Sequence, residues 1–302
     1  GASISFFTPA SEAAPSSSEA TGGTPLKVAL VYNAPVTDQG WNNAWDLSRA
    51  SLEQQYGDKV KFTWKENVPD GPQSGQVMKQ LIDDGNNVIV STSFGYQQEA
   101  LKLAKANPKV TFLQVTALQT APNLSGFDFN GPEGFYIAGM AAAAASKTDK
   151  LGFVGAYPIP SNLSDINAFE LGAQKINPKA RTGVVWTNDW VDLTKAQNAA
   201  QGLVNSGAGA IASLASGPGT APVAKDANVP WIGFEVDQSS RAPDQYVTGV
   251  LLDWAPYLKS QLDAIIAGSW KTGYVVGGVK DGVIVADKWG PLYNALPADK
   301  QK

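Results

Sequence analysis

The chain of 302 residues contains no cysteine and no histidine. Without cysteine it has no disulfide, no thiol nucleophile and no thiolate metal site. Without histidine it lacks the usual general base near neutral pH and the commonest metal ligand of proteins. These absences exclude Ser-His-Asp, Cys-His and HExxH chemistry, and we expect neither a metal site nor a cofactor. Acid–base catalysis by carboxylates or lysine stays open.

Charge and long apolar runs are scarce as well. Charged residues make up 17% of the chain, apolar residues 43%, and the formal net charge is −4. This is the composition of a soluble folded protein. The negative charge and the lack of a Lys/Arg cluster argue against a nucleic-acid partner. No apolar run approaches the about 18 residues of a membrane-spanning helix. The length suits two domains.

Residues 1–25 differ in composition from the rest of the chain. The stretch "SEAAPSSSEATGGTP" is small, polar and rich in Pro, Gly and Ser, which is typical of linkers. We therefore expect a flexible leader, as in a processed exported protein. A disordered N-terminus without a role in export is the alternative.

From Leu26 onward, strand-like apolar runs alternate with amphipathic stretches of helical length. Helices are expected at 41–57, 95–108 and after Pro132, where an almost wholly apolar run begins. The strand-like runs are "LKVALVY", "VKFTWKEN", "NVIVSTS", "VTFLQVT", "LGFVGAY", "RTGVVWTN", "GAIASLA", "PWIGFEV" and "YVTGVLL". This alternation predicts an α/β fold of parallel central sheets flanked by helices.

The alternation runs twice, which predicts two lobes with a ligand cleft between them. We assign residues 26–128 plus 248–276 to the first lobe and residues 129–247 plus 277–302 to the second. In open parallel sheets ligands bind at the carboxyl ends of the strands. The cleft is therefore expected where these ends of the two lobes face each other.

Aromatic, amide and carboxylate side chains recur directly after the predicted strands. Aromatic faces stack on flat ligands, while amides and acids select a hydrogen-bonding edge. The resulting candidates for ligand binding are Asp38, Trp41, Asn42, Phe94, Tyr96, Phe127, Asn162, Asp165 and Asp237. Each also has a structural alternative: Asp38 and Asp237 as helix caps, Trp41 as a core residue, and "SFGY" as a turn with a buried ring.

Five segments, in order along the chain, resemble motifs of one known family. They are "TDQGWNNAW", "TSFGYQQEALKLAKANP", "FNGPEGFYIAGMAAA", "KLGFVGAYPIP…FELGAQKINP" and "GFEVDQ". The chain is similar to the basic membrane protein family of ABC-transporter substrate-binding proteins, over residues 26 to about 281. The resemblance implies a type I periplasmic-binding fold, in which two lobes joined by three crossovers close over a ligand.

The resemblance also implies a function without catalysis. Members are extracytoplasmic, commonly lipid-anchored at a cysteine, and deliver a purine nucleoside or purine base to a membrane permease. Residues carried over by motif are Asp38, Trp41, Asn42, Phe94, Tyr96 and Asp237, the last as the acid that meets ribose. We expect a monomer whose Trp41 stacks on a purine ring, gaining roughly 1–3 kcal/mol.

The sequence departs from the family pattern at three points. Leu252 stands where nucleoside-binding members have a ribose-binding lysine, and it is followed by Asp253, a further candidate. Thr116 or Ala117 replaces an acid, and the lipid-bearing cysteine is missing. Because Leu252 offers a sugar hydroxyl no hydrogen bond, a free base is expected to bind at least as well as its nucleoside. A type I sugar-binding protein and a nucleoside hydrolase with clustered acids remain alternatives.

Overall fold

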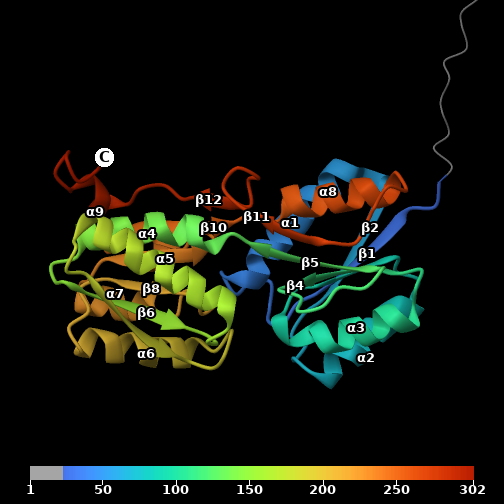
Figure 1. The fold of residues 1–302 in the computed structure, drawn as a ribbon, viewed down its shortest axis with the longest axis horizontal. Coiled ribbons are helices and arrows are strands. Elements are labelled where there is room, and N and C mark those ends of the chain that lie inside the picture. Colours follow the sequence, from blue (N-terminus) through green and yellow to red (C-terminus); the bar gives the residue numbers. More distant parts are fainter. Residues whose placement is uncertain (1–22) are drawn as a thin grey trace, which may run out of the picture.

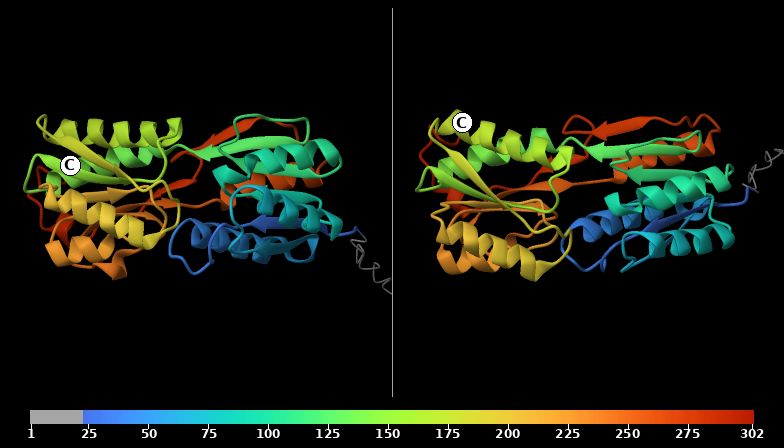
Figure 2. Two further views of the ribbon diagram at one scale, coloured as in Figure 1. Left: turned by 90° about the horizontal axis from the view of Figure 1, so that it is seen from below. Right: turned by 60° about the horizontal axis from the view of Figure 1, so that its bottom comes forward.

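The computed structural model describes residues 23–302, and nearly all of the expected leader, residues 1–25, lies outside this part. The described chain folds into two α/β lobes that lie end to end (Figure 1). Two further views show helices on both faces of each central sheet (Figure 2). The α/β fold with parallel sheets predicted from the alternation is confirmed.

The first lobe is built on a sheet with the strand order β11-β5-β4-β3-β1-β2, and all of its pairs are parallel. Its central strands are buried on both faces, so they consist of continuous apolar runs. The strands are β1 (Leu26–Val31), β2 (Val60–Lys65), β3 (Val88–Ser91), β4 (Thr111–Val115), β5 (Leu124–Phe129) and β11 (Tyr274–Gly277). The covering helices are α1 (Trp41–Tyr56) with α8 (Ala255–Ile266) on one face and α2 (Pro72–Asp83) with α3 (Gln97–Ala106) on the other (Figure 1).

The second lobe has the strand order β12-β10-β9-β8-β6-β7, in which only the pair β10–β12 is antiparallel. The strands are β6 (Lys150–Gly155), β7 (Arg181–Trp186), β8 (Ile211–Ser213), β9 (Trp231–Glu235), β10 (Tyr246–Leu252) and β12 (Ile284–Ala286). The helices are α4 (Gly131–Ala145), α5 (Pro160–Ile176), α6 (Leu193–Asn205), α7 (Ala221–Ala227) and α9 (Pro291–Asn294). None of the helices in the described part of the chain is long and apolar enough to cross a membrane.

Helices α4 and α5 pack with their backbones in close contact. A Cβ atom added at Gly139 would lie 1.9 Å from the carbonyl oxygen of Phe169, and one at Gly172 would lie 2.0 Å from that of Tyr136. Only glycine permits such an approach at either position. The close packing fixes the second half of α5 against the middle of α4.

The chain crosses between the lobes three times, after β5, after β10 and after β11. The assigned boundary at residue 248 needs correction, because it falls inside β10, and β10 pairs with β9 in the second sheet. The segment that returns to the first lobe therefore consists of α8 and β11.

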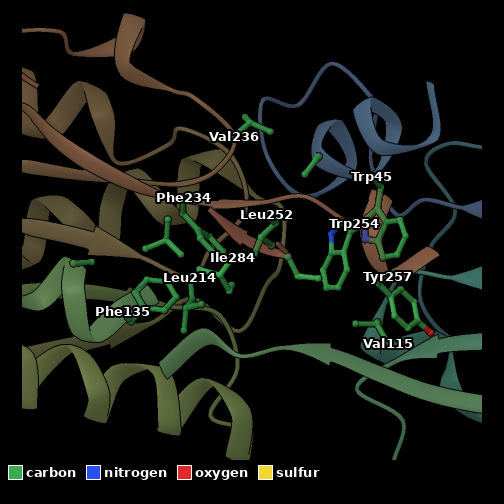
Figure 3. Packing of buried hydrophobic residues seen from close by; sticks show 14 of the residues in the cluster. Trp45, Val115, Phe135, Leu214, Phe234, Val236, Leu252, Trp254, Tyr257 and Ile284 are labelled. Atoms are coloured by element: carbon green, nitrogen blue, oxygen red, sulfur yellow. The ribbon is translucent and has the colours of Figure 1, made fainter. Parts of the chain in front are cut away.

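A hydrophobic cluster continues across the crossovers (Figure 3). Trp254, which lies on the second crossover, stacks on Trp45 of α1 with ring centroids 4.6 Å apart. Phe234 of β9 and Phe135 of α4 belong to the same cluster on the other side. The lobes are thus joined by packed aromatic rings as well as by backbone.

All nine strand-like runs form strands, and the helices expected at 41–57, 95–108 and after Pro132 correspond to α1, α3 and α4. Three strands were missed. β5 has the sequence "LSGFDF", in which serine, glycine and aspartate lower the strand propensity, so it is not among the nine predicted runs. β11 and β12 are short and lie at the edges of the two sheets.

Candidate ligand-binding site

The main cavity lies between the carboxyl ends of the strands of both sheets. It encloses about 600 Å³ of empty space, including its open side. Residues that end or follow β1, β3, β4 and β5 line it from the first lobe, and residues that end or follow β6, β7, β8 and β9 line it from the second. This is the position where open parallel sheets bind ligands.

Aromatic rings from both lobes line the cavity. Trp41 at the start of α1 and Phe94 after β3 come from the first lobe, while Trp190 and Phe234 come from the second. The indole Nε1 of Trp41 donates a hydrogen bond of 2.7 Å to the carbonyl oxygen of Thr92, which fixes the plane of the ring. The cavity therefore offers oriented aromatic faces to a flat ligand.

Three carboxyl groups line the same cavity, and none of its lining residues is Lys, Arg or His. Asp128 is the penultimate residue of β5, Asp165 lies in α5, and Glu235 ends β9. Asp165 and Glu235 are 3% and 2% exposed. None of the three forms an ion pair within residues 23–302.

Burial is the main cause of the raised pKa values of these acids. Burial raises the pKa of Asp128 to about 6. Hydrogen bonds from the backbone N–H of Phe129 and from the Thr116 hydroxyl favour the ionised form and oppose this effect. Burial, with the nearby Asp128 carboxyl as a second cause, raises the pKa of Asp165 to about 8. The pKa of Glu235 is raised well above its ordinary value by burial and by the charge of Asp38. Burial in a cavity lined by no cation thus shifts all three acids toward their neutral forms.

The two lobes touch directly at the rim of the cavity. The backbone N–H of Trp41 donates to the Ser216 hydroxyl at 2.8 Å, and the Gln238 amide donates to the carbonyl oxygen of Gln39 at 2.7 Å. A Cβ atom at Gly40 would lie 2.4 Å from the backbone nitrogen of Gly217. The loop before α1 therefore packs against the loop after β8, with glycine at the closest point.

Four of the candidate residues from the sequence lie at the cavity: Trp41, Phe94, Asn162 and Asp165. The side-chain N–H of Asn162 donates to the carbonyl oxygen of Tyr157 at 2.8 Å, so the side-chain oxygen of Asn162 takes no part in that bond. Trp41 is also packed against the core, because its ring meets Trp45 and Trp254 edge-on. The two interpretations of Trp41, pocket wall and core residue, thus apply together.

Four other candidates stabilise the surroundings and do not line the cavity. Asp38 accepts hydrogen bonds from the backbone N–H groups of Gly40, Asn42 and Asn43 and so caps the start of α1. Asn42 is fully buried and donates to Asp38 and to Asn33, which does line the cavity.

Tyr96 and Phe127 are fully buried in the first lobe. The Tyr96 hydroxyl donates to the carbonyl oxygen of Val68, and the Phe127 ring packs against Trp45 and Tyr257. Neither ring reaches the cavity, because both side chains point into the core beneath it.

Asp237, Asp253 and Leu252 line a second, shallower hollow near the second crossover. Asp237 pairs with Lys288 at 2.8 Å, and the hydrogen bonds of Lys288 and Ser239 lower its pKa to about 2. Asp253 accepts from the backbone N–H of Ala255 at the start of α8. None of the three lines the main cavity, so the proposed ribose contact of Asp237 has no geometric support here.

Sequence reasoning missed Asn33, Trp190 and Glu235 as lining residues. Asn33 and Trp190 follow β1 and β7 and could have been found by the rule that produced the other candidates. Glu235 stood inside a predicted strand. Its φ of +76° turns the chain at the end of β9, and no strand pattern predicts such a turn.

Trp41→Ala should weaken ligand binding by about 1–3 kcal/mol if the ring stacks on a base. It should also lower the free energy of unfolding, because the ring contacts Trp45, Trp254 and Phe129. Calorimetric titration and urea unfolding measure the two effects separately. Trp41→Phe, which keeps an aromatic face, is the control and should retain most of the affinity. Unchanged affinity in Trp41→Ala would exclude stacking.

Comparisons with known proteins identify the family of the chain. The family described as "ABC transporter substrate-binding protein PnrA-like" (Bmp) matches residues 26–302. A purine-binding protein of Brucella abortus is 36% identical over 277 residues, which are 92% of this chain and 78% of that protein. A putative ABC transporter glucose-binding protein of Haloferax volcanii is 32% identical over 89% of this chain and 68% of its own length.

A solved structure shows the same fold. The ABC transporter solute-binding protein of Conexibacter woesei superposes with a TM-score of 0.72 at 24% identity, over 91% of this chain and 92% of its own. The match over residues 26–302 and the Brucella abortus relative confirm the resemblance found in the five sequence motifs. The chain belongs to the Bmp family of PnrA-like substrate-binding proteins of ABC transporters.

Proposed function

We propose that this protein binds a purine base or a purine nucleoside in the cavity between its lobes and delivers it to an ABC importer. The observation that carries the proposal is the lining of the cavity, which combines aromatic rings from both lobes with carboxyls and amides and contains no cation. A purine offers two flat faces for stacking and an edge of N–H donors and ring-nitrogen acceptors. The name of the Brucella abortus relative supports the same ligand class.

A sugar is the second candidate, because the Haloferax volcanii relative is named as a glucose-binding protein. Aromatic rings and acids also suit the apolar face and the hydroxyls of a sugar. Titration with adenine, adenosine, guanine, guanosine and glucose, followed by tryptophan fluorescence and calorimetry, separates the candidates. Binding of glucose in preference to all four purine compounds would contradict the proposal.

The structure does not support the sequence argument that favoured a free base over its nucleoside. That argument depended on Leu252, which is 5% exposed and lies at the second hollow. The acids at the main cavity are Asp128, Asp165 and Glu235, and carboxyls accept from ribose hydroxyls as well as from base N–H groups. The proposal therefore covers both base and nucleoside.

Adenosine should bind at least about tenfold more tightly than AMP. A phosphate in this cavity would meet Asp128, Asp165 and Glu235 without a Lys or Arg side chain to balance its charge. Calorimetric titration of both compounds at equal ionic strength measures the ratio. Equal affinity would show that the phosphate stays outside the cavity or that the ligand lies elsewhere.

The family assignment sets the wider context. Substrate-binding proteins of ABC transporters act outside the cytoplasm, bind small molecules and work with a membrane permease. We propose further that this protein acts as a monomer, that it is anchored by lipid, and that it releases its ligand unchanged. Chromatography of adenosine after incubation with the protein tests the last point, since hydrolysis to adenine would reveal an enzyme.

A further inference from the structure

Asp165 differs from the other two acids at the cavity in its hydrogen bonding. Asp128 accepts from the backbone N–H of Phe129 and from the Thr116 hydroxyl, and Glu235 accepts from the backbone N–H of Gly217. Within residues 23–302 no hydrogen bond or ion pair reaches the Asp165 carboxyl, although the residue is only 3% exposed. Its oxygens are not among the fully enclosed polar atoms that lack a partner, so they keep contact with the cavity, where a ligand can bond them.

The position of Asp165 is fixed by backbone packing. Its side chain lies against the first residue of α4, where a Cβ atom on Gly131 would come within 2.0 Å of the carboxyl oxygen Oδ1. Gly131 follows the crossover from β5, so Asp165 of the second lobe lies directly beside the end of the first lobe. A Lys or Arg side chain cannot balance the charge of the carboxyl there, because none lines the cavity.

We propose that the Asp165 carboxyl recognises the polar edge of the base and is the residue that determines specificity for the substituent at C6 of the purine. The proposal depends on the purine function proposed above. A neutral carboxyl presents one O–H donor beside one C=O acceptor. Adenine presents an amino N–H beside a ring nitrogen, and hypoxanthine and guanine present a ring N–H beside a carbonyl oxygen. Each of these edges pairs with the carboxyl through two hydrogen bonds.

The environment of Asp165 favours the neutral form that such pairing needs. Asp128 on β5 is the carboxyl whose charge acts on Asp165, and Glu235 on β9 lines the same cavity. Glu133 in the first turn of α4 is held by Asn130 and by the N–H of Val279. Burial and the Asp128 carboxyl together raise the pKa of Asp165 to about 8. An asparagine at this position would offer the same donor and acceptor at every pH.

The test combines two variants of Asp165 with matched ligands. Adenine, hypoxanthine and guanine are titrated by calorimetry near pH 7 against 6-methylpurine, which has a similar size and no hydrogen-bonding group at C6. The wild-type protein should prefer its best base over 6-methylpurine by about tenfold or more. Asp165→Asn should keep that preference. Asp165→Leu, which keeps the branched shape without a polar atom, should reduce it to less than about twofold. Asp226→Leu, on the exposed side of α7, is the control and should behave as wild type.

Thermal unfolding of the ligand-free variants shows whether Asp165 has a structural role instead. Because its carboxyl has no partner, Asp165→Asn and Asp165→Leu should fold and melt at or above the wild-type temperature. An unchanged preference for the base in Asp165→Leu would overturn the proposal, and so would a collapse of the melting temperature in both variants. If the wild-type protein binds none of the three bases and no nucleoside, the proposed function itself fails, which is a distinct result.

Discussion

Gly40→Ala should lower the affinity for the ligand by at least about 100-fold while both lobes remain folded. The added Cβ atom would lie 2.4 Å from the backbone nitrogen of Gly217 and 2.5 Å from the Ser216 hydroxyl oxygen, across the rim of the cavity. Gly217 cannot yield easily, because its own N–H donates to Glu235. We therefore expect the variant to hold the lobes apart. A closed state populated at about 1% lowers the apparent affinity about 100-fold.

Calorimetry measures the affinity, and small-angle scattering measures the conformation. The wild-type protein should show a smaller radius of gyration with a saturating purine than without it, whereas Gly40→Ala should keep the larger value. Gly202→Ala is the matched control, because nothing lies within 4 Å of its added Cβ atom. A variant with wild-type affinity and normal compaction would show that the rim contact does not limit closure.

This expectation depends on hinge motion between the lobes, which we propose from the three crossovers. A ligand drives closure only to the extent that it contacts both lobes in the closed state. The cavity satisfies that condition, since Trp41 and Phe94 belong to one lobe and Asp165 and Trp190 to the other. The hydrogen bonds from Trp41 to Ser216 and from Gln238 to Gln39 add contacts between the lobes that closure forms.

The fold was predictable from sequence to the extent that hydrophobic patterns determine it. The buried parallel strands are apolar on both faces, so their runs are visible without knowledge of contacts. β5 escaped detection because "LSGFDF" contains Gly126 and Asp128, and both have a spatial reason to be there. A Cβ on Gly126 would collide with the Tyr274 ring of β11, and Asp128 faces the cavity.

The site was predictable only in part, because the sequence does not show which way a side chain points. Phe127 and Asp128 are neighbours on β5, and alternation along a strand sends the first into the core and the second to the cavity. Without β5 in the prediction, that alternation could not be applied. Asp237 and Glu235 lie two residues apart, and the positive φ at Glu235 decides which of them faces the cavity.

The same acids that line the cavity should set the pH dependence of stability. For Asp128, Asp165 and Glu235 the folded state raises the pKa above its ordinary value, chiefly by burial. Between the unfolded and the folded pKa, the folded protein binds more protons than the unfolded chain. The free energy of unfolding therefore decreases as the pH rises through this range. Asp237 acts in the opposite direction at low pH, because its pKa is lowered to about 2.

Comparison of Asp165→Asn with the wild-type protein isolates the contribution of Asp165 from those of the other acids. The ordinary pKa of 3.8 and the folded value of about 8 define the window. Near pH 4 the difference between the two free energies of unfolding should be at its smallest in this range, since the wild-type carboxyl is protonated in the folded protein and about half protonated in the unfolded chain. As the pH rises toward 8, the variant should gain on the order of 1 kcal/mol per pH unit over the wild type. Urea unfolding of the ligand-free proteins at about pH 4.5, 6 and 7.5 measures this difference directly. The contributions of Asp237 and the other acids cancel in the comparison, because both proteins share them. A difference that stays constant over the range would show that Asp165 is ionised in the folded protein and that a partner holds its charge.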